Sequence, residues 1–270
     1  MAQVPKERAD ILLVEKQLFT SREQAKRAIM AGQVYVDEMQ IMKPGEKVAI
    51  SSEFVLKGKR LQYVSRGGLK LEKAIQVFAI QVEDAILLDI GSSTGGFTDC
   101  ALQNGARHAY ALDVGYNQLD WKIRSDERVT VMERTNFRYS KPEDFEVGLP
   151  TLATIDVSFI SLNLIFPPLA SILVDGGEVV ALVKPQFEAG KDRVGKKGIV
   201  RDAKVHLGVL EQVADYAEQA GFSVEAATFS PITGGEGNIE FLFYLKKAQG
   251  ALSRPDFKQV VDEAHKSLVH

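Results

Sequence analysis

A short polar loop that follows a buried apolar run is the part of this sequence best suited to hold a ligand. The apolar residues 85–88 predict a fully buried parallel strand. Glycines in the loop that follows would let its backbone approach a ligand closely and adopt positive φ. A tight strand-to-helix turn without a ligand remains the alternative. The residues that we expect to contact the ligand are Asp89, Gly91, Ser92, Ser93, Thr94, Gly95, Gly96 and Phe97.

The spacing of the glycines excludes two common classes of nucleotide-binding loop. The dinucleotide-binding fingerprint needs glycines two and five positions after Gly91, and only Gly96 satisfies it, because Ser93 occupies the other position. A phosphate-binding P-loop is also excluded, since no Lys-Ser or Lys-Thr pair follows the glycines. What remains is the type of loop with which S-adenosylmethionine (AdoMet) methyltransferases hold the amino-acid end of their cofactor. We therefore expect AdoMet as the cofactor and no metal.

Two further residues after predicted strands could contact the adenosine part of this cofactor. Asp113 ends the predicted strand 108–113, at a distance from the loop typical of a carboxylate that accepts hydrogen bonds from ribose hydroxyls. A helix cap is the alternative for Asp113. Asn136 follows the next strand and is a candidate partner for the adenine edge. We include Val114, next to Asp113, among the expected cofactor contacts.

Charged residues lie at the ends of three later strands. Asp156 lies at the end of the predicted strand 152–157, Lys184 follows 178–183, and Glu240 lies at the start of the last predicted strand. A lysine buried at a strand end has to be paired or neutral, because an unpaired buried charge is costly. We expect Asp156 to lie near the cofactor and Glu240 to point to the same edge of the sheet.

These residues would be positioned by alternating strands and helices. The alternation predicts a doubly wound, Rossmann-like α/β sheet with helices on both faces, in which ligands bind beyond the carboxyl ends of the strands. Strands are expected at 85–90, 108–113, 129–132, 152–157, 178–183, 223–229 and 239–245, and helices at 69–78, 97–104, 161–173 and 203–220. The glycine- and lysine-containing segment 189–198 is expected to be either a lid over the site or a flexible connector.

The first 60 residues predict a small α+β module. Two short helices, at about 8–17 and 22–30, precede short apolar runs typical of a small sheet. Arg22, Lys26 and Arg27 cluster on the second helix, where they either contact phosphates or form a solvated face. Residues 1–66 hold 12 Lys and Arg against 8 Asp and Glu, a net +4, whereas the rest holds 21 against 28, a net −7. A basic N-terminal segment in an otherwise acidic chain suggests that this segment binds an anionic partner.

Composition excludes several other classes of protein. The single cysteine, Cys100, excludes a disulfide framework and an all-cysteine metal site, and favours a reducing compartment. No apolar run reaches the length of a membrane span, and the first residues lack the apolar region of a signal peptide. We therefore expect a cytoplasmic protein without a membrane partner.

The basic module resembles a known RNA-binding domain. Residues 6–60 contain Ser-Arg-Glu-Gln-Ala-Lys-Arg-Ala-Ile at 21–29 and Gly-Gln-Val-Tyr-Val-Asp at 32–37, a pair of motifs similar to those of the S4-type RNA-binding domain. The resemblance implies that Arg22, Lys26 and Arg27 contact the phosphates of a structured RNA. Arg66, at the junction between the two parts, is expected to contact RNA as well.

Residues 67–246 resemble the FtsJ-type RNA ribose 2′-O-methyltransferases. That family has a Lys-Asp-Lys-Glu tetrad around AdoMet, and its matching positions here are Lys70, Asp156, Lys184 and Glu240. From the chemistry of two lysines in one pocket, we expect Lys184 to be the base toward the 2′-hydroxyl, Asp156 and Glu240 to orient the lysines, and Lys70 to steer the hydroxyl or a nearby phosphate. The opposite assignment of base and helper between the two lysines stays open, because coupled groups titrate jointly. One departure is Ser-Ser-Thr at 92–94, where FtsJ members more often have Ala-Ala-Pro.

The two modules together resemble the TlyA family, often labelled hemolysin A. The resemblance implies AdoMet-dependent methylation of ribosomal RNA, in free form or in ribosomal subunits, at the 2′-hydroxyl of a cytidine. We expect domains at 1–60 and 69–247, a linker at 61–68 and a C-terminal tail at 248–270. The alternatives are an RNA- or ribosome-binding protein without catalysis and a membrane-lytic hemolysin. No DNA partner is expected, and the sequence leaves open the nucleotide, the subunit and the oligomeric state.

Overall fold

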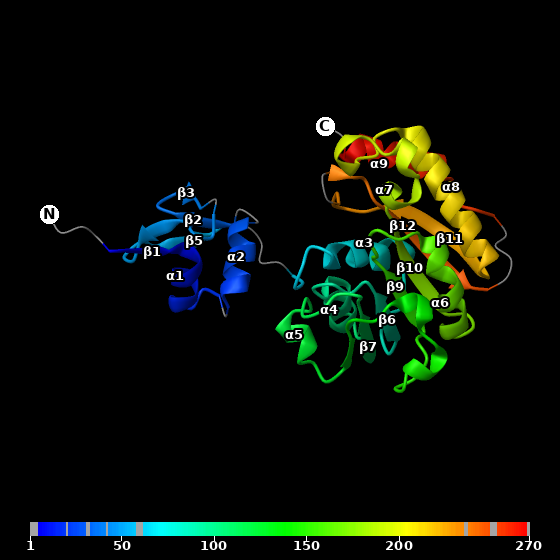
Figure 1. Cartoon of the computed structure of the whole chain (residues 1–270), viewed down its shortest axis with the longest axis horizontal. Coiled ribbons are helices and arrows are strands. Elements are labelled where there is room, and N and C mark those ends of the chain that lie inside the picture. Colours follow the sequence, from blue (N-terminus) through cyan, green and yellow to red (C-terminus); the bar gives the residue numbers. More distant parts are fainter. Residues whose placement is uncertain are drawn as a thin grey trace. The chain divides into compact units, whose positions relative to one another are not determined.

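The chain divides into two compact units, residues 1–60 and 61–270 (Figure 1). The computed structural model describes residues 5–19, 21–30, 33–41, 43–57, 62–234, 237–248 and 253–268. Each unit has a hydrophobic core of its own. The two units are therefore described separately.

The first unit packs a helix pair against short antiparallel strands, which confirms the predicted small α+β module. Its helices are α1 (Ala9–Glu15) and α2 (Arg22–Met30). Strand β2 (Val34–Val36) lies between β3 (Met39–Gln40) and β5 (Phe54–Leu56), while β1 (Lys6–Arg8) pairs with β4 (Lys47–Ala49). Val34 and Val36 face the core while Tyr35 between them does not, as the period of a strand requires.

The second unit is built on a seven-stranded sheet with the order β11-β12-β10-β9-β6-β7-β8, which confirms the predicted doubly wound architecture. Strand β12 is antiparallel to both of its neighbours, β10 and β11, whereas the other neighbouring strands of this sheet pair in parallel. The strand order switches direction between β6 and β9, and such a switch is where open α/β sheets bind ligands. The strands are β6 (Ile86–Ile90), β7 (His108–Leu112), β8 (Val129–Met132), β9 (Leu152–Ile155), β10 (Glu178–Val183), β11 (Phe222–Phe229) and β12 (Phe241–Lys247).

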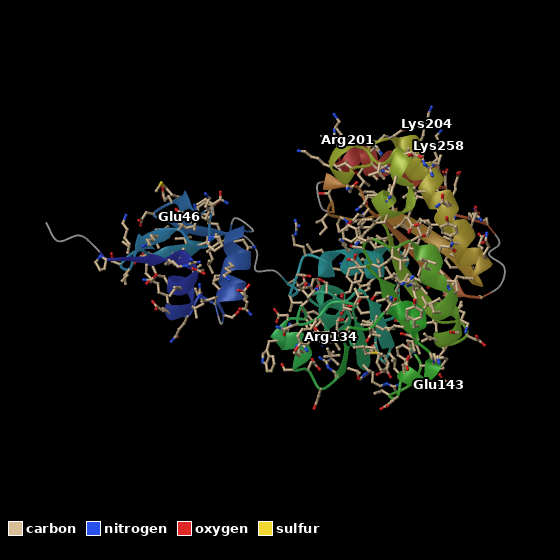
Figure 2. All side chains as sticks on the ribbon, in the orientation of Figure 1. Glu46, Arg134, Glu143, Arg201, Lys204 and Lys258 are labelled. Atoms are coloured by element: carbon tan, nitrogen blue, oxygen red, sulfur yellow. The ribbon has the colours of Figure 1, made fainter. Side chains whose placement is uncertain are left out.

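Helices cover both faces of this sheet, and side chains fill the space between them (Figures 1 and 2). Val179, Ala181 and Val183 of β10 pack in one core with α6, α8 and α9, whereas Val180 and Leu182 pack with α3 and α4. A central parallel strand is apolar on both faces for this reason. The helices are α3 (Gly68–Phe78), α4 (Gly96–Gln103), α5 (Trp121–Arg124), α6 (Phe166–Ile172), α7 (Pro185–Glu188), α8 (Ala203–Gln219) and α9 (Phe257–Leu268).

The helix predicted at 161–173 is divided in the structure. A 3-10 turn at Leu162–Leu164 precedes α6, whose first turn contains Pro167 and Pro168. Proline lacks the N–H that a continuing helix needs, and it disfavours helical backbone in the residue before it, whereas it is well suited to a first turn. The two prolines therefore begin a new helix.

Helix α9 completes the core on one face of the sheet. Phe257 stacks on Phe243 of β12 with ring centroids 5.2 Å apart. The ring of His206, fully buried on α8, lies between α9 and the chain before α8: its Nδ1 is 2.9 Å from Nε2 of His265, and its Nε2 is 3.1 Å from the carbonyl oxygen of Val200. The residues after β12 thus contribute a packed helix to the second unit.

We expect the second unit to lose stability in mild acid through His206. Burial, with a smaller contribution from His265, lowers the pKa of His206 to about 4, against about 6.5 in an unfolded chain. Between these pH values the unfolded state binds the extra proton, so the free energy of unfolding falls as the pH drops, by roughly 3 kcal/mol at most. Thermal unfolding at pH 7 and pH 4.5 measures the effect. A His206→Gln variant should show a smaller difference between the two pH values, and an equal difference would contradict this assignment.

Candidate active site

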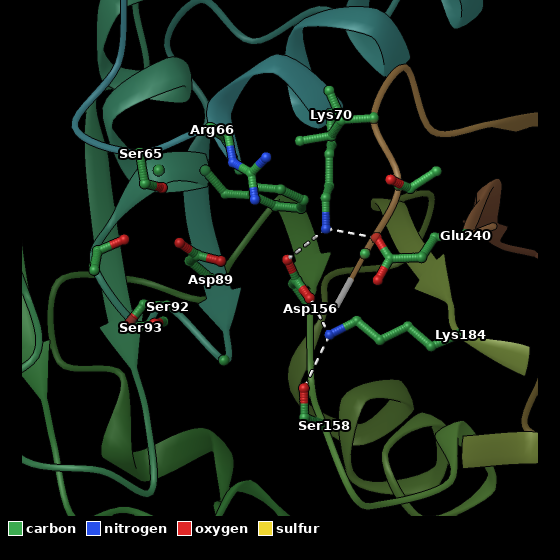
Figure 3. A pocket seen from close by; sticks show the side chains of 18 residues that line it. Ser65, Arg66, Lys70, Asp89, Ser92, Ser93, Asp156, Ser158, Lys184 and Glu240 are labelled. Carbon is green, nitrogen blue, oxygen red and sulfur yellow. Dashed lines mark hydrogen bonds and ion pairs between the residues drawn. The ribbon is translucent and has the colours of Figure 1, made fainter. Parts of the chain in front are cut away.

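A cavity of about 390 Å³ lies beyond the carboxyl ends of the central strands (Figure 3). Its walls come from the loop after β6, the first turn of α3, the ends of β9 and β10, and residues 232–234 before β12. The predicted tetrad lines this cavity together with the glycine loop. The tetrad and most of the glycine loop therefore lie together at the switch in strand order.

Sheet topology explains why residues so far apart in sequence meet here. Strands β9 and β10 are parallel neighbours, so Asp156 and Lys184, each directly after its strand, emerge at the same edge. Because β12 is antiparallel to β10, the start of β12 lies at that edge, and Glu240 directly precedes it. Lys70 reaches the same place from the first turn of α3. The single antiparallel strand is what brings Glu240 to the other three residues.

The four side chains form an alternating chain of ion pairs (Figure 3). Nζ of Lys70 lies 2.7 Å from Oε2 of Glu240 and 3.6 Å from Oδ2 of Asp156. Nζ of Lys184 lies 2.5 Å from Oδ1 of Asp156 and donates to Oγ of Ser158 at 3.0 Å. Lys70, Lys184 and Glu240 are buried, and their charges balance with that of Asp156. Burying these charges carries a desolvation cost even when they compensate each other, and such clusters in a cleft are typical of functional sites.

The glycine loop packs closely against two neighbouring segments of the chain. Gly91 has φ +86° and Gly95 has φ +91°, a region in which glycine is favoured. A Cβ on Gly91 would lie 2.5 Å from the backbone oxygen of Asp156, and one on Gly96 would lie 2.3 Å from Oγ of Ser65. Gly91 and Gly96 are therefore needed as glycine, because the segments that carry Asp156 and Ser65 pack too closely against them for a side chain.

Asp89, near the end of β6, stabilises the chain that leads into the glycine loop. Its carboxylate accepts hydrogen bonds from the amide and hydroxyl of Thr98, at 3.1 and 2.7 Å, and from the hydroxyl of Thr154 at 2.9 Å. Burial raises the pKa of Asp89 to about 6, although the hydrogen bonds from the two threonines oppose the shift. This arrangement fixes the end of β6 against α4 and β9 and so shapes the floor of the cavity.

The expected cofactor residues divide into those that line the cavity and those beside it. The carboxylate of Asp113 stabilises the backbone on both sides of it. It accepts hydrogen bonds from the amide of Ser93 in the glycine loop at 2.8 Å and from the amide of Gly115 at 2.7 Å. Asn136 caps a 3-10 turn by accepting from the amide of Arg138. The lining residues among those predicted are Asp89, Gly91, Ser92, Ser93, Thr94, Gly96, Phe97 and Asp156, whereas Gly95, Asp113, Val114 and Asn136 are outside the lining.

Sequence reasoning missed several lining residues. Ser158 lies two positions after Asp156 and holds Lys184, so its place in the motif was the available signal. Gly234 lies against Glu240, where a Cβ would be 2.1 Å from Oε1. Nothing in the sequence marks the other missed residues, which are Ser65, Gly67, Ile232 and Thr233. Arg66 was predicted to bind RNA and lies at this cavity, exposed to solvent.

The candidate RNA-binding face of the first unit is organised by a buried carboxylate. Asp10 is fully buried and accepts from Arg8 at 2.9 and 3.1 Å and from Arg22 at 2.9 Å. The Arg8 hydrogen bond, with help from Arg22, lowers the pKa of Asp10 to about 2 despite its burial. Lys26 pairs with Glu23 at 2.6 Å, and the side chain of Arg27 lies outside the described residues. Asp10 therefore holds two guanidinium groups side by side.

Comparison with known proteins agrees with this geometry. The sequence model of the FtsJ-like methyltransferases matches residues 63–247, and that of the S4 domain matches residues 7–54. The chain is 59% identical over 268 residues to the "Putative rRNA methyltransferase YqxC" of Bacillus subtilis, covering 97% of this chain and 95% of that one. It is 40% identical over 259 residues to the "16S/23S rRNA (cytidine-2′-O)-methyltransferase TlyA" of Mycobacterium tuberculosis, covering 95% and 96%.

A solved structure shows the same fold across both units. The "Putative hemolysin from Streptococcus thermophilus" superposes with a TM-score of 0.78 at 57% identity, covering 98% of each chain. A relative from Brachyspira hyodysenteriae, 42% identical over 222 residues and covering 82% of this chain and 92% of that one, is named "Hemolysin A". Among the residues that the structure describes, no helix is both long and apolar enough to span a membrane.

Fold, cavity and family matches together define an AdoMet-dependent methyltransferase joined to an S4 RNA-binding domain. The chain belongs to the FtsJ-like methyltransferases and, within them, to the TlyA-type proteins that carry both modules.

Proposed function

We propose that the protein transfers the methyl group of AdoMet to the ribose 2′-hydroxyl of a cytidine in ribosomal RNA. The observation that carries the proposal is the Lys70–Glu240 and Lys184–Asp156 chain of ion pairs at the cavity beside the glycine loop. The names of the Bacillus and Mycobacterium relatives support ribosomal RNA, and that of the second supports cytidine. The lone buried Cys100 fits a reducing, cytoplasmic setting.

The fit of AdoMet to the cavity is supported by the glycine loop, which lines the cavity with the polar residues Ser92, Ser93 and Thr94. When bound, it supplies an activated methyl group next to the acceptor. We assign its contacts to the loop residues that line the cavity, with Asp113 accepting from the ribose and Asn136 meeting the adenine edge. The charge of its sulfonium adds to that of the two lysines, and so favours loss of a proton from one of them.

The contacts of the two lysines support Lys184 as the base. Lys70 has two carboxylates as partners, which stabilise its ammonium form. Lys184 has one carboxylate, Asp156, and one neutral hydroxyl, Ser158. A neutral amine has two N–H groups and one lone pair. If both N–H groups are donated to Asp156 and Ser158, the lone pair is left for the 2′-hydroxyl. Lys184 then takes the hydroxyl proton, and Asp156 stabilises the ammonium that forms.

The decisive experiment follows methyl-labelled AdoMet into ribosomal RNA. The purified protein is incubated with separated small and large ribosomal subunits and with naked RNA, and the RNA is digested to nucleosides. We expect label in 2′-O-methylcytidine. Label on a base would contradict the proposed acceptor. Binding of AdoMet and RNA without any transfer would favour the alternative of a non-catalytic RNA-binding protein.

The S4 unit is proposed to supply RNA affinity through phosphate contacts. Arg22→Gln removes a half-exposed guanidinium held by Asp10 while leaving Arg8 in place. We expect binding to ribosomal RNA to weaken roughly 3- to 10-fold and the slope of log affinity against log salt to decrease by about one. AdoMet binding should not change. Filter binding or anisotropy across a salt series measures the effect.

Arg128→Gln is the matched control for Arg22→Gln. Arg128 pairs with Asp126 at 2.8 Å. It directly precedes β8 and so lies at the amino ends of the parallel strands, whereas the cavity lies beyond their carboxyl ends. We expect RNA binding by this variant to remain as in the wild type. Equal weakening by both substitutions would mean a general charge effect and would contradict a specific role for Arg22.

A further inference from the structure

The loops that carry Asp156 and Lys184 are joined at their far ends by Glu188. Its Oε2 accepts from the hydroxyl of Ser161 at 2.7 Å, and its Oε1 accepts from the amide of Leu162 at 2.8 Å. Glu188 ends the short helix α7 that Lys184 begins, whereas Ser161 and Leu162 lie five and six positions after Asp156. Each loop therefore begins with a tetrad residue and ends where the two loops are hydrogen-bonded to each other through Glu188.

The setting of Glu188 is unusual for a carboxylate. Glu188 is 7% exposed, and within the described part of the chain it forms no ion pair with a lysine, arginine or histidine. Burial raises its pKa, while the hydrogen bonds from Leu162 and Ser161 oppose the shift. A buried charge without a counter-ion is costly. The two hydrogen bonds that Glu188 accepts therefore have to offset the cost of its burial.

The backbone of the first loop needs such support. Phe159 has φ +63°, a left-handed conformation that costs a bulky residue about 1–3 kcal/mol and persists only where surrounding contacts enforce it. This residue follows Ser158, the partner of Lys184. Its ring lies against that of Phe187, with centroids 4.9 Å apart. Beyond Phe159, the next fixed point of the loop is the pair of bonds to Glu188.

We infer that Glu188 is a positioning residue for catalysis, because it fixes the turn that aims Asp156 and Ser158 at the amine of Lys184. The inference rests on the proposed function, in which Lys184 is the base. Glu188 does not line the cavity, so it acts through the two loops and not on the substrate. A shift of about 1 Å in such a geometry can cost about 100-fold in rate.

The test compares Glu188→Ala, Ser161→Ala and Ser161→Thr with the wild type. We expect kcat to fall about 10- to 100-fold in Glu188→Ala, which loses both hydrogen bonds of the carboxylate, and about 3- to 10-fold in Ser161→Ala, which keeps the bond from Leu162. Ser161→Ala also loses the bond from the amide of Asn163 to the Ser161 hydroxyl, which Ser161→Thr can retain. Ser161→Thr keeps a hydroxyl and should retain most of the wild-type kcat. In all three, KM for RNA and the Kd for AdoMet should stay within about twofold of the wild type.

A second readout separates positioning from a merely structural role. If the loops aim partners at Lys184, disturbing them should move the pH at which kcat is half-maximal by about half a unit or more, whereas a fall in the amount of folded protein scales kcat equally at every pH. Gln212→Ala is the matched control, because Gln212 donates to the backbone oxygen of Glu188 at 3.3 Å and leaves its carboxylate untouched. We expect a near wild-type kcat for this variant.

The outcomes distinguish this inference from the proposed function. A wild type that transfers no methyl group overturns both. If the wild type is active but Ser161→Ala has an unchanged kcat and pH profile, the inference alone is overturned. Loss of AdoMet binding in parallel with kcat would also overturn it, since Glu188 would then support the cofactor site. If Glu188→Ala does not fold, the comparison of Ser161→Ala with Ser161→Thr decides the question.

Discussion

Lys184→Ala is expected to reduce kcat for methyl transfer about 10²- to 10⁴-fold, the range for loss of a general base. The variant removes the amine that lies 2.5 Å from Asp156 and 3.0 Å from Ser158, and so leaves the 2′-hydroxyl without a proton acceptor. We expect the Kd for AdoMet and for RNA to change little, because neither the glycine loop nor the S4 unit depends on Lys184. Single-turnover transfer and separate binding titrations measure the two effects.

Lys184→Arg is the variant that distinguishes a base from a fixed positive charge. Arginine keeps the charge beside Asp156 but stays protonated in proteins, so it cannot accept the hydroxyl proton. We expect Lys184→Arg to be nearly as inactive as Lys184→Ala. Substantial activity in the arginine variant would mean that Lys184 acts through its charge. A parallel loss of AdoMet binding would instead make it a cofactor residue.

Local sequence signals were sufficient to predict most of the sheet and to place the glycine loop directly after β6. The central strands β6, β9 and β10 are largely apolar because helices cover both of their faces, and a polar residue marks the end of several strands, as Asp113, Asp156 and Lys184 do. Glycines mark the loop because a Cβ at these positions would collide with neighbouring atoms of the protein. The beginning of α6 was also predictable, since Pro167 and Pro168 mark a first turn.

Contacts between distant, unpatterned residues could not be predicted in this way. Glu188 and Ser161 are 27 positions apart, and each alone is an ordinary polar residue beside a helix. Asp10 likewise lies 12 positions before Arg22, and its burial under two arginines depends on how α1 packs on α2. Such pairs become visible only when the fold brings them together. They also support the residues that sequence motifs do identify.

Gly91→Ala is expected to abolish AdoMet binding and methyl transfer together. The new Cβ would lie 2.5 Å from the backbone oxygen of Asp156 and 2.9 Å from its carbonyl carbon. Backbone atoms cannot rotate away as a side chain does, so either the glycine loop or the Asp156 loop must shift. The φ of +86° adds strain for any residue with a Cβ. We expect kcat/KM to fall at least about 100-fold, as binding and geometry are both lost.

Gly176→Ala separates the two causes of this loss. Gly176 has φ +74°, close to that of Gly91, but a Cβ there would have no atom within 4 Å. It therefore carries the backbone strain without the overlap, and we expect it to cost about 1 kcal/mol of stability while AdoMet still binds. Calorimetric titration with AdoMet and thermal unfolding of both variants make the comparison. If the two variants lose AdoMet binding equally, backbone strain alone explains the requirement for glycine. If only Gly91→Ala loses it, glycine is needed because the cofactor loop and the loop of Asp156 pack too closely for any side chain between them.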